Sequence, residues 1–368
     1  MTSTLVARKT SLYSIHRSLK ARMTEFGGWE MPVEYSGIVQ EHLAVRQAAG
    51  LFDISHMGEI LVEGPESLQL VQKVTCNDAS RLNEGQAQYS ALLYPEGTFV
   101  DDILVHRLGP QRFLLCVNAA NTEKDFQWIC KQNDIGATLR DVSHEYAQLA
   151  VQGPQALAIV QQLTSVPLAR LRYYWFAHGP VAGVDSIIAR TGYTGEDGFE
   201  LYFAPEYAER LWESLTRTGQ PLGLLPAGLG ARNTLRLEAK MALYGHEISE
   251  STTPWEADLA WIVKMDKGDF VGRAALTQQQ SEGPKRKLVG FEMTGKGIAR
   301  DGYPVVAEGK QVGQVTSGSP APFLKKNIGL AYVPAGLAQV NQPLEIQVRA
   351  NLVSAKVVPT PFYRRTRT

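Results

Sequence analysis

The segment Arg190-Thr-Gly-Tyr-Thr-Gly-Glu-Asp-Gly-Phe-Glu-Leu201 combines three glycines, one tyrosine and three carboxylates. Glycines let the backbone approach another group closely, and Tyr193 offers a flat ring face. A phosphate-binding loop would carry backbone N–H groups and a lysine here rather than acids. A carboxylate accepts two parallel N–H hydrogen bonds from an aminopyrimidine edge, as it does from arginine. The segment therefore favours a flat, donor-rich heterocycle such as a pterin.

The elements expected around this segment mix helices with hairpin strands. Apolar spacing predicts helices over residues 38–49, 65–74, 154–163, 206–216 and 227–242, and another helix capped by Asn121. Strands are predicted at 89–94, 102–107, 113–117, 146–151, 187–190 and 200–203, and a turn running into a strand at 52–62. This order indicates an α+β fold rather than a doubly wound parallel sheet.

A polar stretch rich in helix breakers, residues 278–284, is the best candidate for a domain boundary. Beyond it, short strand candidates recur every eight to twelve residues, at 288–292, 303–306, 312–316, 328–333, 344–348 and 355–358. Regularly spaced short strands predict a small all-β barrel or sandwich.

Composition excludes several broad classes of protein. The 368 residues carry 37 basic and 37 acidic side chains, whereas a nucleic-acid-binding protein normally has a basic excess. The three cysteines are scattered in no metal-ligand spacing, and Cys116 lies in an apolar run that predicts a buried thiol. We therefore expect no metal site. With no run of eighteen apolar residues and no signal core, we expect a cytoplasmic protein.

Two acidic residues, Asp101 and Asp102, open a predicted strand after a turn. Because side chains alternate along a strand, at most one of the two faces a site. A carboxylate at the mouth of a buried strand can steer protons or charge. The structural alternative is an aspartate that closes the turn by binding its own backbone.

Polar residues elsewhere leave their roles open. Arg232 and Arg236 share one helix face and could clamp a carboxylate ligand, or else form surface salt bridges, for example to Glu238. A lone His56 has no second histidine at metal-ligand spacing, which favours a structural role. Asn118 ends a predicted strand, where side chains often face ligands.

These segments, in this order, resemble the T-protein family, the aminomethyltransferases of the glycine cleavage system. The resemblance covers nearly the whole chain. It rests on Phe26–Pro32, Gly50–Glu59, Asp101-Asp102, Val117–Asp125, Gln152–Pro154, Arg190–Leu201, Pro226–Arg232, Arg236–Glu238 and Thr316–Gly318.

The resemblance implies a fold and a reaction. The family fold is a three-domain cloverleaf with folate in its central opening, which would make residues 1–276 a folate-binding region of two interleaved α+β domains and 285–362 a small β-barrel. The boundaries inside the first region would lie near 55, 140 and 245. The reaction would move the one-carbon unit of an aminomethyl group on the lipoyl arm of H protein to tetrahydrofolate. Its products would be 5,10-methylenetetrahydrofolate, ammonia and dihydrolipoyl H protein. Nothing in the sequence demands more than a monomer.

The resemblance also implies site residues, position by position. Asp102 would be the catalytic carboxylate, which orients the folate amines, and Glu200 would grip the pterin ring. Further residues that would contact folate are Tyr193, Arg232, Asn118, Tyr89, Met57, Tyr244 and Tyr363.

Two other functions fit the same resemblance. One is a folate-dependent demethylase of the same fold, which would not need a lipoyl protein as its donor. The other is a folate-binding protein of iron–sulfur assembly, whose relatives place a cysteine in the glycine-rich segment. Residues 192–198 contain no cysteine here.

Overall fold

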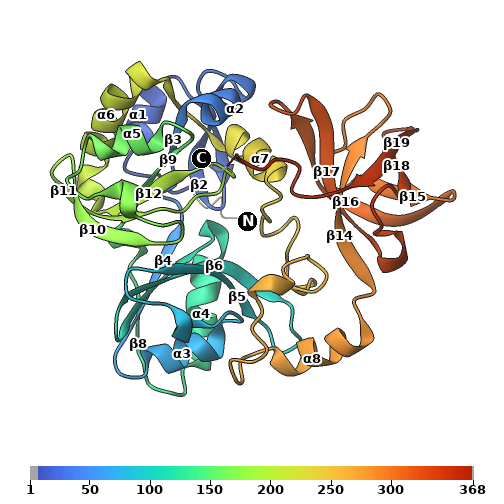
Figure 1. Ribbon diagram of the computed structural model, residues 1–368, viewed down its shortest axis with the longest axis horizontal. Coiled ribbons are helices and arrows are strands. Elements are labelled where there is room, and N and C mark those ends of the chain that lie inside the picture. Colours follow the sequence, from blue (N-terminus) through green and yellow to red (C-terminus); the bar gives the residue numbers. More distant parts are fainter. Residues whose placement is uncertain (1–6, 367–368) are drawn as a thin grey trace, which may run out of the picture. The chain divides into compact units, whose positions relative to one another are not determined.

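The computed structural model describes residues 7–366, in which helices are interspersed with four β-sheets (Figure 1). In the described part of the chain, no helix is both long and apolar enough to cross a membrane. The chain folds into two compact units, each assembled from separate stretches of the sequence. Among the described residues, unit 1 comprises those up to Leu68 together with Leu82–Gln88 and Leu104–Asn233, and unit 2 comprises Gln69–Arg81, Tyr89–Ile103 and those from Thr234 onward.

The centre of unit 1 is a six-stranded sheet in the order β10-β11-β12-β9-β3-β13. Neighbouring strands run antiparallel, except that β13 lies parallel to β3. The strands are β3 Ala49–Asp53, β9 Ala147–Gln152, β10 Phe176–Val181, β11 Val184–Ala189, β12 Gly198–Phe203 and β13 Leu224–Pro226. Together with the helices, this largely antiparallel sheet confirms the predicted α+β class.

Helices α5 (Ala156–Gln161) and α6 (Ala208–Gly219) pack against this sheet. Leu211, Trp212 and Leu215 of α6 recur at helical spacing and are buried in one cluster with Leu149 and Leu201 of the central strands. An apolar stripe of this kind is what holds a helix on a sheet. The side chains on the opposite face alternate with these, and Tyr202 is buried there in a second cluster with Leu61 and Leu114. Every residue of β9 and β12 is therefore buried.

The remaining elements of the N-terminal two thirds include the predicted helices and strands, together with four elements that were not predicted, at Tyr13–Ser18, Arg22–Phe26, Trp29–Glu34 and Thr138–Asp141. A five-stranded sheet has the order β5-β6-β7-β4-β8, and a separate hairpin pairs β1 with β2. These elements are α1 Tyr13–Ser18, β1 Arg22–Phe26, β2 Trp29–Glu34, α2 Ile38–Gln47, β4 Gly58–Glu63, α3 Ser67–Val74, β5 Ala87–Leu93, β6 Phe99–Gly109, β7 Arg112–Val117, α4 Thr122–Gln132, β8 Thr138–Asp141 and α7 Leu229–Glu238.

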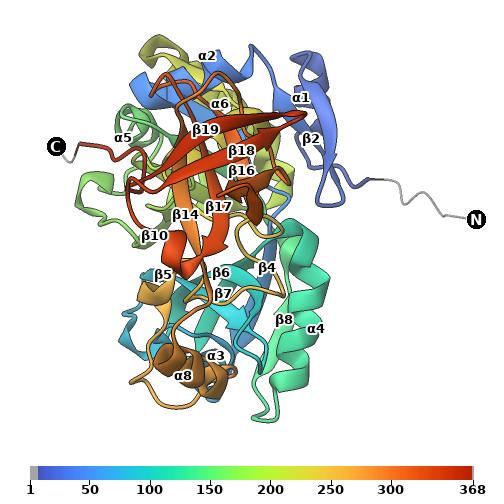
Figure 2. The same cartoon turned by 90° about the vertical axis from the view of Figure 1, so that its right-hand side faces the viewer.

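In unit 2, six strands close into a barrel in the order β14-β17-β16-β15-β18-β19 (Figures 1 and 2). Along β19, Val353, Ala355 and Val357 are buried while Ser354 and Lys356 are exposed, as the period of two in a strand requires. The strands are β14 Arg286–Met293, β15 Pro304–Ala307, β16 Lys310–Ala321, β17 Lys326–Pro334, β18 Pro343–Val348 and β19 Asn351–Val358. The predicted barrel is confirmed, and the alternative of a sandwich is excluded.

Most of the polar stretch 278–284 is helical, because α8 (Arg273–Glu282) continues until Gly283, whose φ is +77°. Two local predictions were wrong. The expected turn at Phe52 and Asp53 is the end of strand β3. Asn121 precedes α4 without a side-chain capping bond, since a 3-10 turn already gives its backbone a helical conformation.

A buried polar cluster ties the N-terminal segment to the end of β3. The side chains of His16 and Asp53 are fully buried and meet with 2.8 Å between Nε2 and Oδ2. The Thr10 hydroxyl donates to the same carboxylate at 2.7 Å, and the Ser55 amide donates to its other oxygen at 2.9 Å. Burial alone would raise the pKa of Asp53, but the hydrogen bond and charge of His16 hold it below its usual range.

Replacing this carboxylate, Asp53→Ala, is expected to lower the free energy of unfolding by about 3 kcal/mol, because buried donors lose their acceptor. The stabilisation from Asp53 is present above the usual aspartate pKa and is lost as the pH falls through the lowered pKa of the folded protein. Urea titrations at neutral and acidic pH measure both effects. The control is Asp185→Ala, at an exposed position of β11. Equal losses in the two variants would contradict the assigned role.

Candidate functional site

The glycine-rich loop between β11 and β12 packs tightly against Gln152 of strand β9. A Cβ atom added to Gly192 would lie 1.9 Å from Gln152 Oε1, and one added to Gly198 would lie 2.4 Å from the Val151 carbonyl oxygen. Gly195 has a φ of +83°, which favours glycine. All three glycines of the segment therefore have a structural reason, and for two of them the closely approaching group is the protein itself.

Two of the three carboxylates in the segment 190–201 are held by arginines. Asp197 accepts bonds from Arg190 Nε at 3.0 Å and Nη2 at 2.5 Å. Glu196 accepts from Arg46 Nη1 at 2.9 Å, and the same nitrogen donates to the Thr194 carbonyl at 2.8 Å. These ion pairs fix the shape of the loop. Among the residues that the structure describes, Glu200, the third carboxylate of the segment, forms no such pair with an arginine.

Glu200 lies in strand β12 and is only 7% exposed. The Thr191 hydroxyl donates to its Oε2 at 2.5 Å. Burial raises the pKa of Glu200, although the Thr191 hydrogen bond and the charge of Arg232 act in the opposite direction. A ligand that donates N–H groups to this carboxylate would replace the water it has lost and favour its ionised form.

The aromatic ring of the loop, Tyr193, faces a guanidinium. The Cζ atom of Arg232, on helix α7, lies 4.6 Å from the centre of the Tyr193 ring. A cation over a ring face is attracted by the ring quadrupole. Unit 1 therefore holds Tyr193, Glu200 and Arg232 in one neighbourhood.

Met57 and Asn118 belong to the same unit. Met57 packs against a cluster that contains Cys116 and Tyr202, and Glu200 influences the pKa of both groups. Asn118 follows Val117, which pairs with Gly58, so it lies at the strand end expected for it. Cys116 is buried as predicted, and burial raises its thiol pKa well above the usual range.

His56 is buried, and its ring packs edge-on to Phe26 with 5.6 Å between the centroids. Burial and the charge of Arg232 lower the pKa of His56 to about 3, so the ring is neutral at neutral pH. Within residues 7–366, no group of three or more His, Cys, Asp or Glu side chains is arranged to hold a metal ion. A neutral, buried ring agrees with the structural role predicted for His56.

In unit 2, Asp102 is paired with Tyr89. The Tyr89 hydroxyl donates to Asp102 Oδ2 at 2.8 Å, and both side chains are half-buried. Asp101 is fully buried, so the two acidic side chains alternate as expected for a strand. The accessible carboxylate of the pair is therefore Asp102, whose catalytic role stays a prediction.

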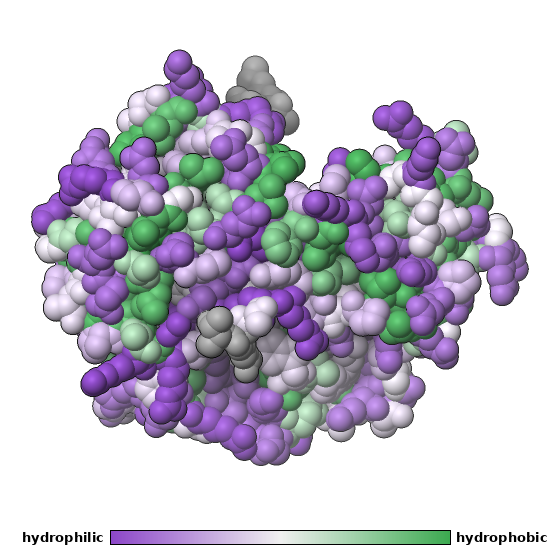
Figure 3. Space-filling view, turned by 45° about the horizontal axis from the view of Figure 1, so that its top comes forward, coloured by the Kyte–Doolittle hydropathy of each residue, from purple (hydrophilic) through white to green (hydrophobic). Residues whose placement is uncertain are grey.

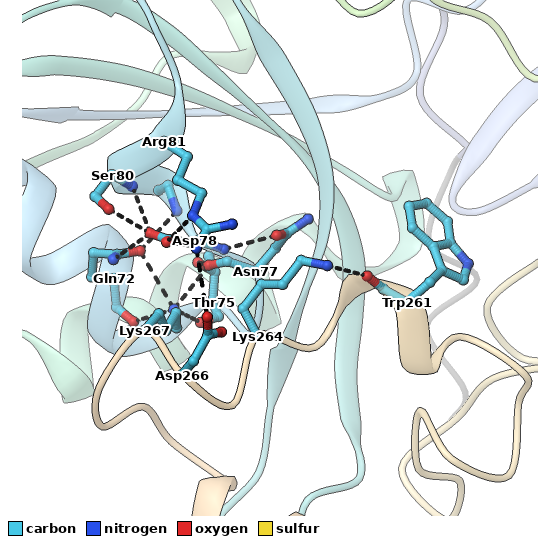
Figure 4. A network of polar contacts seen from close by, with 11 residues as sticks. Gln72, Thr75, Asn77, Asp78, Ser80, Arg81, Trp261, Lys264, Asp266 and Lys267 are labelled. Atoms are coloured by element: carbon cyan, nitrogen blue, oxygen red, sulfur yellow. Dashed lines mark hydrogen bonds and ion pairs between the residues drawn. The ribbon is translucent and has the colours of Figure 1, made fainter.

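Sequence reasoning missed Trp261, whose ring stacks on Tyr89 with 5.9 Å between the centroids and 30° between the planes. Trp261 is 58% exposed, and Lys264 Nζ donates to its carbonyl at 2.7 Å (Figure 4). Nothing local in the sequence links Trp261 to Tyr89, because the two residues come from distant segments.

Lys267 fixes the segment that supports Tyr89. Its ammonium donates to the carbonyl oxygens of Gln72 at 2.7 Å, Thr75 at 2.5 Å and Asn77 at 2.9 Å (Figure 4). The side-chain amide of Asn77 in turn donates to the Tyr89 carbonyl at 2.9 Å. Three hydrogen bonds from Lys267 therefore stabilise the segment 72–77, which in turn is hydrogen-bonded to strand β5 through Asn77.

Tyr244 and Tyr363, the other two tyrosines that the resemblance places at folate, lie in unit 2. Tyr244 packs against the same hydrophobic cluster as Tyr89. Tyr363 follows the barrel, donates its backbone N–H to the Glu238 carbonyl at 2.8 Å, and packs edge-on to Phe323 at 5.4 Å between centroids. Tyr244 therefore shares the neighbourhood of Tyr89, whereas Tyr363 lies beside the end of α7.

Arg236 is not a surface residue, so the interpretation as a surface salt bridge was wrong. It is buried, and it donates to Glu247 Oε2 at 2.6 Å and to the Ser317 hydroxyl of strand β16 at 2.7 Å. Thr316 donates to the other oxygen of Glu247 at 2.7 Å. The pair joins the end of α7 to the barrel within unit 2.

Arg236→Met is expected to lower the free energy of unfolding by about 3–5 kcal/mol, because it leaves Glu247 buried without its cation. Denaturant titration measures this loss. The control is Lys240→Met, which removes an ion pair to Asp258, a side chain that is 67% exposed; pairs at the surface contribute about 0–1 kcal/mol. A loss no larger than in the control would show that the Arg236 pair is not a structural link.

The exposed surface seen in Figure 3 mixes hydrophilic residues with smaller hydrophobic areas. This face therefore presents no broad apolar area.

Residues 12–267 match the family described as the GCVT N-terminal domain, and residues 286–364 match the glycine cleavage T-protein C-terminal barrel domain. The chain belongs to the glycine cleavage T-protein family. The aminomethyltransferase of Acidobacterium capsulatum is 54% identical over 364 residues, which cover 97% of this chain and 96% of that protein. The aminomethyltransferase of Koribacter versatilis is 52% identical over 367 residues, with the same coverage.

A solved structure agrees. The glycine cleavage system aminomethyltransferase T from Bartonella henselae superposes with a TM-score of 0.91 and is 34% identical, over 97% of this chain and 98% of that one. The T-protein fold is thus shared along nearly the whole length. Near-full-length relatives with one activity identify this T-protein family member as an aminomethyltransferase enzyme.

Proposed function

We propose that this enzyme transfers the one-carbon unit of the aminomethyl group on lipoylated H protein to tetrahydrofolate. N5 of the folate forms a bond to the methylene carbon as ammonia leaves. Closure onto N10 then breaks the carbon–sulfur bond and leaves the lipoyl group as a dithiol. The products are 5,10-methylenetetrahydrofolate, ammonia and dihydrolipoyl H protein.

The observation that carries this proposal is the buried carboxylate of Glu200 in a chain that matches aminomethyltransferases end to end. Glu200 lies outside the arginine pairs of the loop, and burial raises its pKa. An aminopyrimidine edge supplies the two parallel N–H donors that such a carboxylate needs. In this proposal Glu200 binds the pterin, and Tyr193 with Arg232 supplies a flat, cationic surface beside it.

In the same proposal Asp102 is the catalytic carboxylate. It would orient the folate amines and stabilise the positive charge that develops at nitrogen as the new bond forms. The Tyr89 hydroxyl, 2.8 Å away, would fix the direction of that carboxylate. The reactants are intrinsically reactive, so positioning by these groups can supply much of the rate.

The remaining parts of the proposal concern ligands and partners. Asn118, Met57, Tyr244 and Tyr363 are proposed to contact folate. H protein is the proposed macromolecular partner, and a monomeric state and a cytoplasmic location stay predictions. Three free cysteines, two of them buried, support a reducing compartment.

The donor requirement tests the proposal against a folate-dependent demethylase. Formation of 5,10-methylenetetrahydrofolate is measured with aminomethyl-loaded lipoyl H protein and, separately, with N-methylated glycines. We expect product only with H protein. Product from an N-methylated glycine without H protein would establish the demethylase instead. Tetrahydrofolate binding without turnover of either donor would point to a non-catalytic folate-binding protein.

A further inference from the structure

We propose that Gln152 is a positioning residue that holds Tyr193 and Glu200 in the arrangement that binds the pterin. The inference rests on the proposed function, because it takes these two residues as ligand contacts. Gln152 lies at the end of β9, is 1% exposed, and has its backbone paired with Gly198 on one side and Gly50 on the other. Its side chain therefore starts from a fixed point in the sheet.

The side-chain amide uses both of its ends on the residues that flank Tyr193. Gln152 Nε2 donates to the Thr191 carbonyl at 3.0 Å, and Gln152 Oε1 accepts from the Thr194 hydroxyl at 2.9 Å. Thr191 and Thr194 are themselves buried. A buried amide with both ends bonded has one orientation, so it fixes the loop at both sides of the tyrosine.

The same contact reaches Glu200 through Thr191. While the Thr191 carbonyl is held by Gln152, the Thr191 hydroxyl donates to Glu200 Oε2 at 2.5 Å. A shift of the Thr191 backbone would move this donor away from the carboxylate. The Gln152 amide thus fixes both the position of the Tyr193 ring and the direction of the Glu200 carboxylate, the two groups that this site would present to a ligand.

Two glycines show how closely the backbone of the loop packs against the Gln152 amide. The atoms nearest to a Cβ at Gly192 are Oε1, Cδ and Nε2 of Gln152, at 1.9, 2.5 and 2.5 Å. At Gly198 a Cβ would meet Gln152 Nε2 at 2.5 Å. The amide, in its observed position, occupies the space of a side chain at residue 192, and at residue 198 it shares that role with the Val151 carbonyl oxygen, 2.4 Å from a Cβ.

The test compares Gln152→Met, which keeps the length of the side chain and removes its hydrogen bonds, with Gln161→Met. Gln161 also clamps a loop of unit 1: its amide donates to the carbonyls of Thr164 at 3.0 Å and Val166 at 2.9 Å. Gln161 contacts no proposed ligand residue. Both variants are expected to lower Tm, but only Gln152→Met is expected to raise the Kd for tetrahydrofolate, by about tenfold or more.

Kd is measured by titration well below the Tm of each variant. An unchanged Kd in folded Gln152→Met would overturn the inference, because it would reduce Gln152 to a stabilising residue. Failure of the wild-type protein to bind tetrahydrofolate would instead overturn the proposed function. If Gln152→Met does not fold, Thr194→Val is compared with Thr194→Ser, which keeps the hydroxyl. A higher Kd in the valine variant alone supports the inference, and equal values in both overturn it.

A double-mutant cycle tests the seating of the loop without any ligand. Gly192→Ala is expected to lower Tm strongly in the wild type and only slightly in a Gln152→Ala background, since the colliding amide is then absent. Additive losses of Tm would show that Gln152 does not determine the space at Gly192.

Discussion

Asp102→Asn is expected to lower kcat for aminomethyl transfer by about 100-fold or more, while the Kd for tetrahydrofolate changes little. An amide keeps the shape of the side chain and can still accept the Tyr89 hydrogen bond, which spans 2.8 Å in the wild type. It cannot supply the negative charge that stabilises positive nitrogen in the transition state. The loss should therefore appear in turnover at saturating H protein and tetrahydrofolate, measured as ammonia release.

Two further variants place this result in context. Asp266→Asn removes the charge of a carboxylate in the same unit that is 73% exposed, and it should leave kcat unchanged. Tyr89→Phe removes the donor to Asp102 and keeps the ring that stacks on Trp261, so its loss of kcat should be smaller than that of Asp102→Asn. Full activity of Asp102→Asn would show that the carboxylate has another role.

Glu200→Gln is expected to raise the Kd for tetrahydrofolate by about 10- to 100-fold, the range that corresponds to losing charge-assisted hydrogen bonds. The amide has one acceptor oxygen instead of two, and it turns N–H donors toward a donor-rich ligand edge. Because the change acts on binding, kcat at saturating tetrahydrofolate should fall less than affinity does. Equilibrium titration and steady-state kinetics separate the two quantities.

The pH dependence of affinity gives a second readout for Glu200. Burial raises its pKa, so in the free enzyme the carboxyl takes up a proton at a higher pH than an ordinary glutamate. Affinity for tetrahydrofolate should fall as the pH falls through that raised pKa, since only the ionised form offers two acceptor oxygens. Glu200→Gln should lack this titration. The exposed Glu209→Gln should keep wild-type affinity and pH dependence. A wild-type Kd in Glu200→Gln would exclude Glu200 as the pterin contact.

Periodic and local signals in the sequence predicted most of the fold. The barrel strands were found from their spacing and turns, and residues such as Val353 and Val357 follow the expected alternation. The α6 helix was found from its apolar stripe. The candidate site residues came mainly from the family resemblance. The fold adds the contacts between Tyr193 and Arg232 and between Tyr89 and Asp102.

What the sequence could not predict depends on tertiary contacts. The four-residue spacing of Arg232 and Arg236 suggested that both lie on one exposed helix face. Arg236 is instead buried and paired with Glu247, which comes from a later loop. The sequence does not distinguish the carboxylates of Glu196 and Asp197 from that of Glu200. Only the fold shows that arginines pair with the first two. The polar residues 278–282 lack the breakers that end a helix before Gly283, so polarity alone could not show that most of this stretch is helical.

The most direct test of the account is ammonia release from aminomethyl-loaded lipoyl H protein, measured with and without tetrahydrofolate. The account predicts slow release without tetrahydrofolate and a strong stimulation when it is added, with stoichiometric 5,10-methylenetetrahydrofolate. Absence of stimulation, in a protein that binds tetrahydrofolate, would contradict the proposed transfer and point to a different one-carbon donor or to a non-catalytic role.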